Sequence, residues 1–153
     1  VHVCFPSGWR PERIVGQGFH AIHKPVPLFA EDPRASRSML DSMVERGPYV
    51  RFVWTVCADA HLDHHPERGR RLPFEADTRE AYLRVERQTT VPFQDVGCSL
   101  FLIRTYLYAF ERLRSEQRAA LRSSLQAMPP AIARYKGLES AMEHATRLLA
   151  PDR

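Results

Sequence analysis

The stretch that decides the fold is Leu83 to Tyr106, which reads LRVERQTTVPFQDVGCSLFLIRTY. Apolar and polar residues alternate along it, which predicts two strands, Ala81 to Thr90 and Cys98 to Phe110. A proline, an aspartate and a glycine lie in the connection, so the two strands are expected to pair antiparallel. The same stretch places charged side chains inside apolar runs, where an unpaired charge needs a partner, a ligand or water. It therefore indicates a buried polar site.

The rest of the chain supplies a third strand and several helices. Tyr49 to Cys57 alternates in the same way and predicts that strand. The pattern indicates an α+β fold in which short helices flank an antiparallel sheet and a helical tail follows it. The other expected elements are a short strand at 2–5, helical turns at 11–15 and 19–22, a helix at 34–46, an exposed loop at 58–78 and two helices within 113–128 and 138–149.

Composition is that of an ordinary globular domain. The 153 residues are 44% hydrophobic and 26% charged, which fits about one domain with a real core. The chain begins at Val1 in a strand-like run without an initiator Met, so we expect a fragment that lacks an N-terminal part. The net charge of +4 comes from arginines interleaved with acids, which favours a solvated surface and no nucleic-acid partner.

The cysteines and the apolar runs predict a cytoplasmic protein. Cys4, Cys57 and Cys98 are odd in number and far apart, which favours a reducing compartment over a disulfide framework. No apolar run approaches the roughly 18 residues that span a bilayer, and no signal peptide is visible. We therefore expect no membrane association.

His23 is the candidate metal ligand. It lies before the rigid Pro25-Val26-Pro27 segment, and an imidazole held by a stiff backbone over an apolar cavity suits an axial haem ligand. An isolated histidine in such a loop is more often a packing residue, so His23 alone decides nothing. His20 is the fallback ligand.

The other histidines are expected at the surface. His61, His64 and His65 lie in the charged loop, and no neighbouring carboxylate or cysteine completes a recognisable metal site. We expect these three side chains and His144 to be solvated.

The strand 81–90 carries a row of polar residues. Alternation places Arg84, Glu86 and Gln88 on one face and Arg87 on the other. A solvated sheet face is an equally good interpretation of this row.

The next strand favours a site. Arg104 shares an otherwise apolar face there and is expected to pair with Glu86 across the ladder. Such a pair at a cavity wall suits a small cationic amine or bound dioxygen. Arg51 and Trp54 are expected to line the same space.

Six short motifs lie in order along nearly the whole chain: CFPSGW at 4–9, IHKPVP at 22–27, Arg-x-x-Trp at 51–54, LRVERQT at 83–89, FLIRTY at 101–106 and YKGL at 135–138. Together they resemble the haem-dependent oxidative N-demethylases, whose haem subunit is a PAS-like domain. At Val53 and at Thr90 to Phe93 the chain departs from the family, near the expected pocket, and this leaves the substrate open.

The resemblance implies a PAS-like core at 1–110 that binds haem b, with C-terminal helices at 111–153 packed on it. It implies that dimethylamine or a similar amine is oxidised with O2, and that electrons arrive from NADPH through FMN and a 2Fe-2S centre on a reductase partner. We expect His23 to ligate the iron. Glu86 with Arg87 or Arg104 would form the catalytic wall, and Arg51, Trp54 and Gln88 would contact the cofactor.

Two other hypotheses remain open from the sequence. One is a haem-binding PAS sensor without turnover, which would use the same histidine. The other is a haem-free structural domain in which His23 and the Glu-Arg-Gln run are buried hydrogen-bonding residues. Product formation separates the first from the enzyme, and haem binding separates the second.

Overall fold

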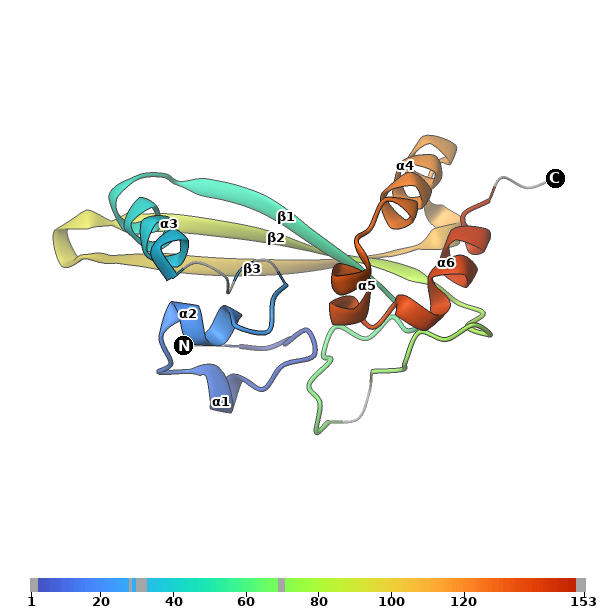
Figure 1. The fold of residues 1–153 in the computed structure, drawn as a ribbon, viewed down its shortest axis with the longest axis horizontal. Helices are drawn as coiled ribbons and strands as arrows, with labels where there is room; N and C mark the ends of the chain where they lie inside the picture. The colour runs from blue at the N-terminus through green and yellow to red at the C-terminus, as the bar shows by residue number, and fades with distance from the viewer. Residues whose placement is uncertain (1–2, 28, 30–32, 69–70, 151–153) are drawn as a thin grey trace.

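The computed structural model describes residues 3–27, 29, 33–68 and 71–150. They form an α+β fold around one antiparallel sheet of order β1-β2-β3, as the alternation predicts (Figure 1). The elements are α1 (Pro11–Ile14), α2 (Phe19–His23), α3 (Pro33–Glu45), β1 (Tyr49–Cys57), β2 (Tyr82–Phe93), β3 (Cys98–Ala109), α4 (Ser115–Gln126), α5 (Pro130–Lys136) and α6 (Met142–Leu148).

The β2–β3 hairpin is longer than its sequence suggests. β2 continues through Pro92 to Phe93, which lies opposite Cys98. β1 pairs with β2 only as far as Tyr49, opposite Thr90. Beyond Thr90, β2 is therefore free of β1 on one side, and a proline is tolerated at such an edge. The turn closes at Gly97, whose φ of +61° is a left-handed conformation that glycine adopts without strain.

Two predicted elements differ from the structure. Residues 3–5 form bends rather than a strand, and residues 1–2 lie outside the described residues. The Pro129-Pro130 pair ends the helix before it, as expected, but Pro130 also starts α5. Proline suits the first position of a helix because the amide hydrogen it lacks has no partner there.

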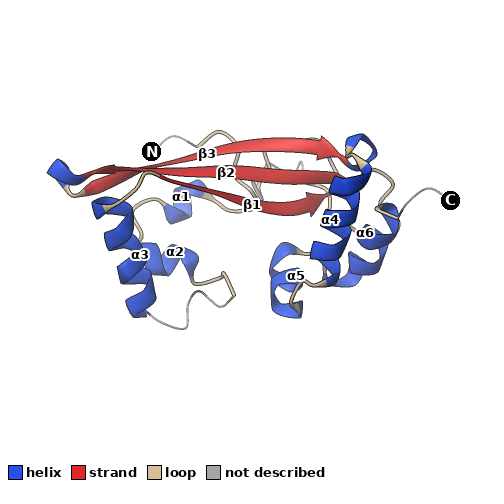
Figure 2. Cartoon of the chain, turned by 90° about the horizontal axis from the view of Figure 1, so that it is seen from above, coloured by secondary structure: helices blue, strands red, loops and turns tan. Residues whose placement is uncertain are grey.

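Helices lie at both ends of the sheet. Figure 2 shows α2 and α3 near the hairpin end and α4, α5 and α6 near the other end. The main core lies at the second end, where Trp54, Val56 and Leu83 share one sheet face and pack against the C-terminal helices. Its buried members are Val56, Phe74, Ala81, Phe110, Leu113, Leu121, Leu125, Leu138, Ala141, Ala145 and Leu149. One apolar cluster thus joins residues from both predicted parts of the chain.

Polar contacts fasten the C-terminal helices to the sheet. Arg118 on α4 donates to the carbonyl oxygens of Phe110, Leu148 and Ala150. Lys136 at the end of α5 donates to the carbonyl oxygen of Trp54 on β1. Because β1 is an edge strand, this lysine satisfies an acceptor that no further strand pairs with. In the described part of the chain, no helix has the length and apolarity needed to cross a bilayer.

Candidate functional site

A row of polar side chains crosses one face of β2. The register places Arg84, Glu86 and Gln88 on the same face as Arg51 of β1, which lies opposite Gln88. Arg84 is 1% exposed and Gln88 8%, while Glu86 is half-buried. The prediction that Arg84, Glu86 and Gln88 share one face is therefore confirmed. Their burial excludes the alternative interpretation of a solvated sheet face.

Ser7 connects this row to the N-terminal segment. The Arg84 Nε–H donates to Ser7 Oγ over 3.1 Å, and the Ser7 hydroxyl donates to Glu86 Oε1. The Ser7 hydroxyl therefore separates the guanidinium from the carboxylate while bonding both. Arg84 also donates to the carbonyl oxygens of His61 and Leu62, so all three acceptors of this buried cation are neutral groups.

Gln88 holds the other side of Glu86. Its Nε2 amide donates to Glu86 Oε2 at 3.0 Å, and its Oε1 accepts from Arg51 Nε at 2.7 Å. Both ends of the amide are thus occupied, which makes Gln88 a link between Arg51 and Glu86. We name the five residues Ser7, Arg51, Arg84, Glu86 and Gln88 the Glu86 network.

Two cations, Arg84 and Lys136, interact electrostatically with Glu86 but form no ion pair with it. Among the described residues, no ion pair within 4.0 Å includes Glu86. Burial lowers the pKa of Arg84 and of Lys136, and the Glu86 charge opposes both shifts. Burial, and then the Glu86 charge, raise the pKa of the Tyr135 hydroxyl. Within the described part of the chain, the Glu86 carboxylate therefore accepts hydrogen bonds from neutral donors alone.

The predicted pairing of Glu86 with Arg104 is wrong. Glu86 lies opposite Thr105, whereas Arg104 lies opposite Arg87, on the other face of the sheet. Arg104 instead stacks over the Tyr106 ring at 5.2 Å. A single-residue change of register would be needed to bring Arg104 to Glu86, because adjacent residues of a strand point to opposite faces.

Arg51 and Trp54 also lie on opposite faces, so the prediction that they line one space is wrong. Trp54 belongs to the core face, and Lys136 lies 5.4 Å from its ring centroid. Arg51 faces the Glu86 network.

His23 is the last residue of α2, and its ring is held in one tautomer. Its Nδ1 lies 2.8 Å from the carbonyl oxygen of Phe19, and because a carbonyl only accepts, Nδ1 carries the proton. Its Nε2 has no hydrogen-bond partner among the described residues. The rings of Phe19 and Phe29 lie 4.3 Å and 4.8 Å away, between centroids. The result is a half-buried imidazole whose Nε2 no described residue occupies.

His20, the fallback ligand, has a hydroxyl group rather than a carbonyl as its hydrogen-bond partner. Its Nδ1 lies 3.1 Å from the hydroxyl of Ser36 on α3, and Ser36 is buried. This contact ties α2 to α3.

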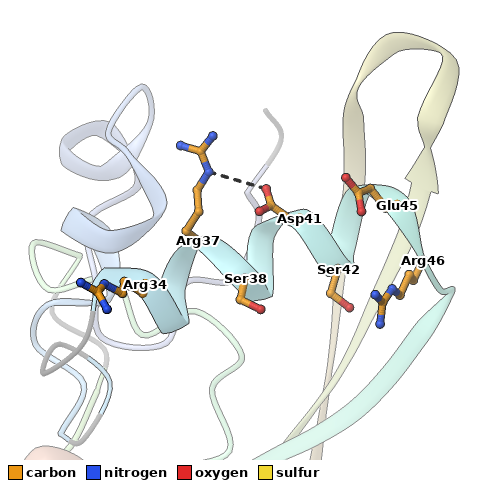
Figure 3. Close-up of a pocket in the computed structure, with 7 residues that line it drawn as sticks. All are labelled: Arg34, Arg37, Ser38, Asp41, Ser42, Glu45 and Arg46. Atoms are coloured by element: carbon orange, nitrogen blue, oxygen red, sulfur yellow. Dashed lines mark ion pairs between the residues drawn. The ribbon is translucent and has the colours of Figure 1, made fainter.

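One surface hollow runs along α3. Its volume is about 420 Å³, and α3 with the residue after it lines it (Figure 3). The side chains drawn there are charged or hydroxylated, and Arg37 pairs with Asp41 at 3.7 Å. A polar groove on one helix suits a solvated surface rather than an apolar cofactor.

The prediction that the loop histidines are solvated holds only for His61. His64 is 3% exposed and His65 7%. The His64 Nε2–H donates to Asp59 Oδ1 at 2.8 Å, and Asp59 also accepts the backbone N–H groups of His61 and Leu72. The loop is therefore organised around a buried carboxylate. The sequence analysis did not identify Asp59 as this buried acceptor, because a loop rich in charged residues predicts solvent exposure.

His144 is likewise not solvated. It is half-buried, and its Nε2 lies 2.6 Å from the carbonyl oxygen of Thr78. Among the described residues, no group of three or more His, Cys, Asp or Glu side chains is placed to hold a metal ion.

Residues 1–146 match the family described as haem-dependent oxidative N-demethylase, alpha subunit-like. The chain belongs to this family. The match covers the sheet, the Glu86 network and His23, and it confirms the resemblance carried by the six motifs. The description places haem and an oxidative N-demethylase activity in the family, and the words "alpha subunit" indicate an assembly of several subunits.

The chemistry of His23 fits a haem iron. A ligating histidine characteristically donates its second ring N–H to a carbonyl or carboxylate, which fixes the ring and raises its basicity, and the Phe19 carbonyl has this place. Cys57 fits poorly, because burial and the nearby Asp59 raise the pKa of its thiol to about 11. A thiol that stays protonated is a weak ligand.

The Asp59–His64 pair predicts a pH-dependent stability. Burial lowers the pKa of His64 below its usual 6.5, although Asp59 opposes this shift. The unfolded chain therefore takes up a proton at His64 before the folded protein does, so the free energy of unfolding decreases as pH falls below 6.5. We expect this decrease between pH 7.5 and 5.5 to be smaller in His64→Gln than in wild type, by urea denaturation. His61→Gln, at an exposed position, is the control; an unchanged pH slope in His64→Gln would contradict the assignment.

Proposed function

We propose that this protein catalyses the haem-dependent oxidative N-demethylation of a small secondary amine such as dimethylamine. In this proposal O2 is the oxidant, and electrons come from NADPH through FMN and a 2Fe-2S centre on a reductase subunit. His23 ligates the iron and Glu86 binds the amine. The family description supports the reaction class and the presence of a further subunit.

The observation that carries the proposal is the set of groups bound to Glu86. A secondary amine is a cation at neutral pH and has two N–H donors, so it needs a carboxylate that is not already paired. Glu86 accepts from the neutral Ser7 hydroxyl and the neutral Gln88 amide, which fix its orientation and leave its charge unpaired. Charge-assisted bonds to such a group are about twice as strong as neutral ones.

The other residues of the network position Glu86. Arg84 acts through the Ser7 hydroxyl and Arg51 acts through the Gln88 amide. Only Nε of Arg51 is occupied by Gln88, and Arg51 is exposed, so its terminal nitrogens suit a haem propionate. We assign Arg87, Arg104 and Trp54 no contact with the amine, since they lie on the opposite face.

A bound haem would supply the activation of O2 and the oxidising equivalent. The chain contributes the ligand and its surroundings: the Phe19 carbonyl holds the Nδ1 proton of His23. The rings of Phe19 and Phe29 flank the imidazole and shield it from water. Lys136 keeps its ammonium on the Trp54 carbonyl rather than on Glu86, which leaves that carboxylate to the substrate.

We expect His23→Ala to weaken haem binding and change the Soret spectrum, because the variant removes the free Nε2. Haem titration of the purified protein measures both. His20→Ala is the matched control, since His20 lies in the same helix, and its Nδ1 contacts the Ser36 hydroxyl on α3, whereas the Phe19 and Phe29 rings flank His23. An unchanged haem affinity and Soret band in His23→Ala would remove His23 from the iron.

The enzyme and the sensor differ in turnover. Haem-loaded protein supplied with dimethylamine, NADPH and the reductase should release formaldehyde. Haem binding without formaldehyde would favour the non-catalytic sensor and contradict the proposed activity.

We expect Glu86→Gln to raise KM for the amine by on the order of 10- to 100-fold, the effect of losing one charge-assisted hydrogen bond. The Soret band should stay unchanged, because Glu86 is not assigned to the iron; the amide keeps one oxygen, so it can accept from Ser7 or from Gln88 but no longer from both. Glu116→Gln, on the exposed surface of α4, is the control. Equal KM values for Glu86→Gln and Glu116→Gln would show that the amine binds elsewhere.

A further inference from the structure

A second hollow lies where the loop after β1 meets the N-terminal segment. Its volume is about 280 Å³, and its lining residues are Gly8, His64, His65, Pro66 and Arg71. None of these belongs to the Glu86 network. A function for this hollow is therefore independent of the proposed N-demethylation.

His64 is rigidly oriented at this hollow. Its backbone pairs with the N-terminal segment, since its N–H donates to the Pro6 carbonyl and its own carbonyl accepts from the Gly8 N–H. Its Nε2–H is fixed on Asp59, and both residues are buried. This tautomer leaves a lone pair on Nδ1, which has no hydrogen-bond partner among the described residues. His64 thus offers one fixed acceptor.

Arg71 offers a cation at the same hollow. Its guanidinium lies next to Gly8, where a Cβ would be only 2.7 Å from Nη1. Arg71 has no hydrogen bond or ion pair with the described residues. An arginine with its planar set of donors free suits an oxyanion.

His65 adds no acceptor to the hollow. Its Nδ1 accepts from the Glu67 backbone N–H, and its Nε2–H donates to Glu12. The ligand therefore meets a cationic donor at Arg71 and a single acceptor at His64. A ligand that satisfies both groups carries a negative oxygen and a hydrogen-bond donor such as an O–H group.

We propose that this hollow binds inorganic phosphate, with a charged oxygen on Arg71 and its O–H donating to His64 Nδ1. Inorganic phosphate keeps at least one proton at neutral pH. Sulfate has none, and a phosphomonoester has largely lost its last proton, whose pKa is about 6. The acceptor on His64 thus discriminates between oxyanions that Arg71 alone would bind equally.

Calorimetric titration of the full chain at pH 7.5 with phosphate, sulfate and methyl phosphate tests the proposal. We expect phosphate to bind at least about tenfold more tightly than the other two, the effect of one hydrogen bond to an anion. Equal binding of phosphate and sulfate would reduce the site to nonspecific attraction by Arg71 and overturn the proposal, as would no binding of phosphate.

Variants locate the site without disturbing the core. Arg71→Gln should weaken phosphate binding at least about tenfold, and Arg79→Gln, an exposed arginine outside the hollow, should not. In wild type, phosphate should shift the ¹⁵N resonance of His64 Nδ1. Unchanged affinity in Arg71→Gln, or an unshifted His64 resonance at saturating phosphate, would show that phosphate binds elsewhere.

Discussion

The structure depends on hydrogen-bonding one buried cation, Arg84, which lies near the start of the central strand β2. Its side chain is 1% exposed, and an uncompensated charge in such a place costs several kcal/mol. Its hydrogen bonds go to the Ser7 hydroxyl and to the carbonyls of His61 and Leu62. One guanidinium therefore holds the N-terminal segment and the loop after β1 against the sheet. The same bond to Ser7 orients Glu86.

Much of this architecture follows from the sequence, because alternation is local. The two-residue period of a strand is enough to predict the bounds of β1. It is also enough to place Arg84, Glu86 and Gln88 on one face of β2. Ser7 could not be predicted as a partner of Glu86, since 79 residues separate them. The register of β3 against β2 could not be predicted either, because it depends on where the hairpin closes. For this reason the predicted pairing of Arg104 with Glu86 was wrong.

The burial of the loop histidines His64 and His65 could not be predicted from the composition of the loop. A loop rich in charge predicts solvent exposure, but Asp59 accepts from His61, His64 and Leu72 within its own loop. A carboxylate bonded to backbone N–H groups and an imidazole can be buried at little cost. The Glu86 network and the Asp59 loop are thus two solutions to one problem, the burial of charge without a direct Arg–carboxylate pair. Ser7 and His64 also form a β-bridge that joins them.

Hydrogen exchange in Arg84→Met tests most directly whether Arg84 holds these segments in place. Arg87→Met, an exposed arginine on the same strand, is the reference. The amides to follow are those of Gly8 and His64, which bond across the interface between the N-terminal segment and the loop. Faster exchange at both amides in Arg84→Met alone, with the sheet still protected, is the expected result. Unchanged exchange at Gly8 and His64 in a folded Arg84→Met protein would contradict the central role of Arg84.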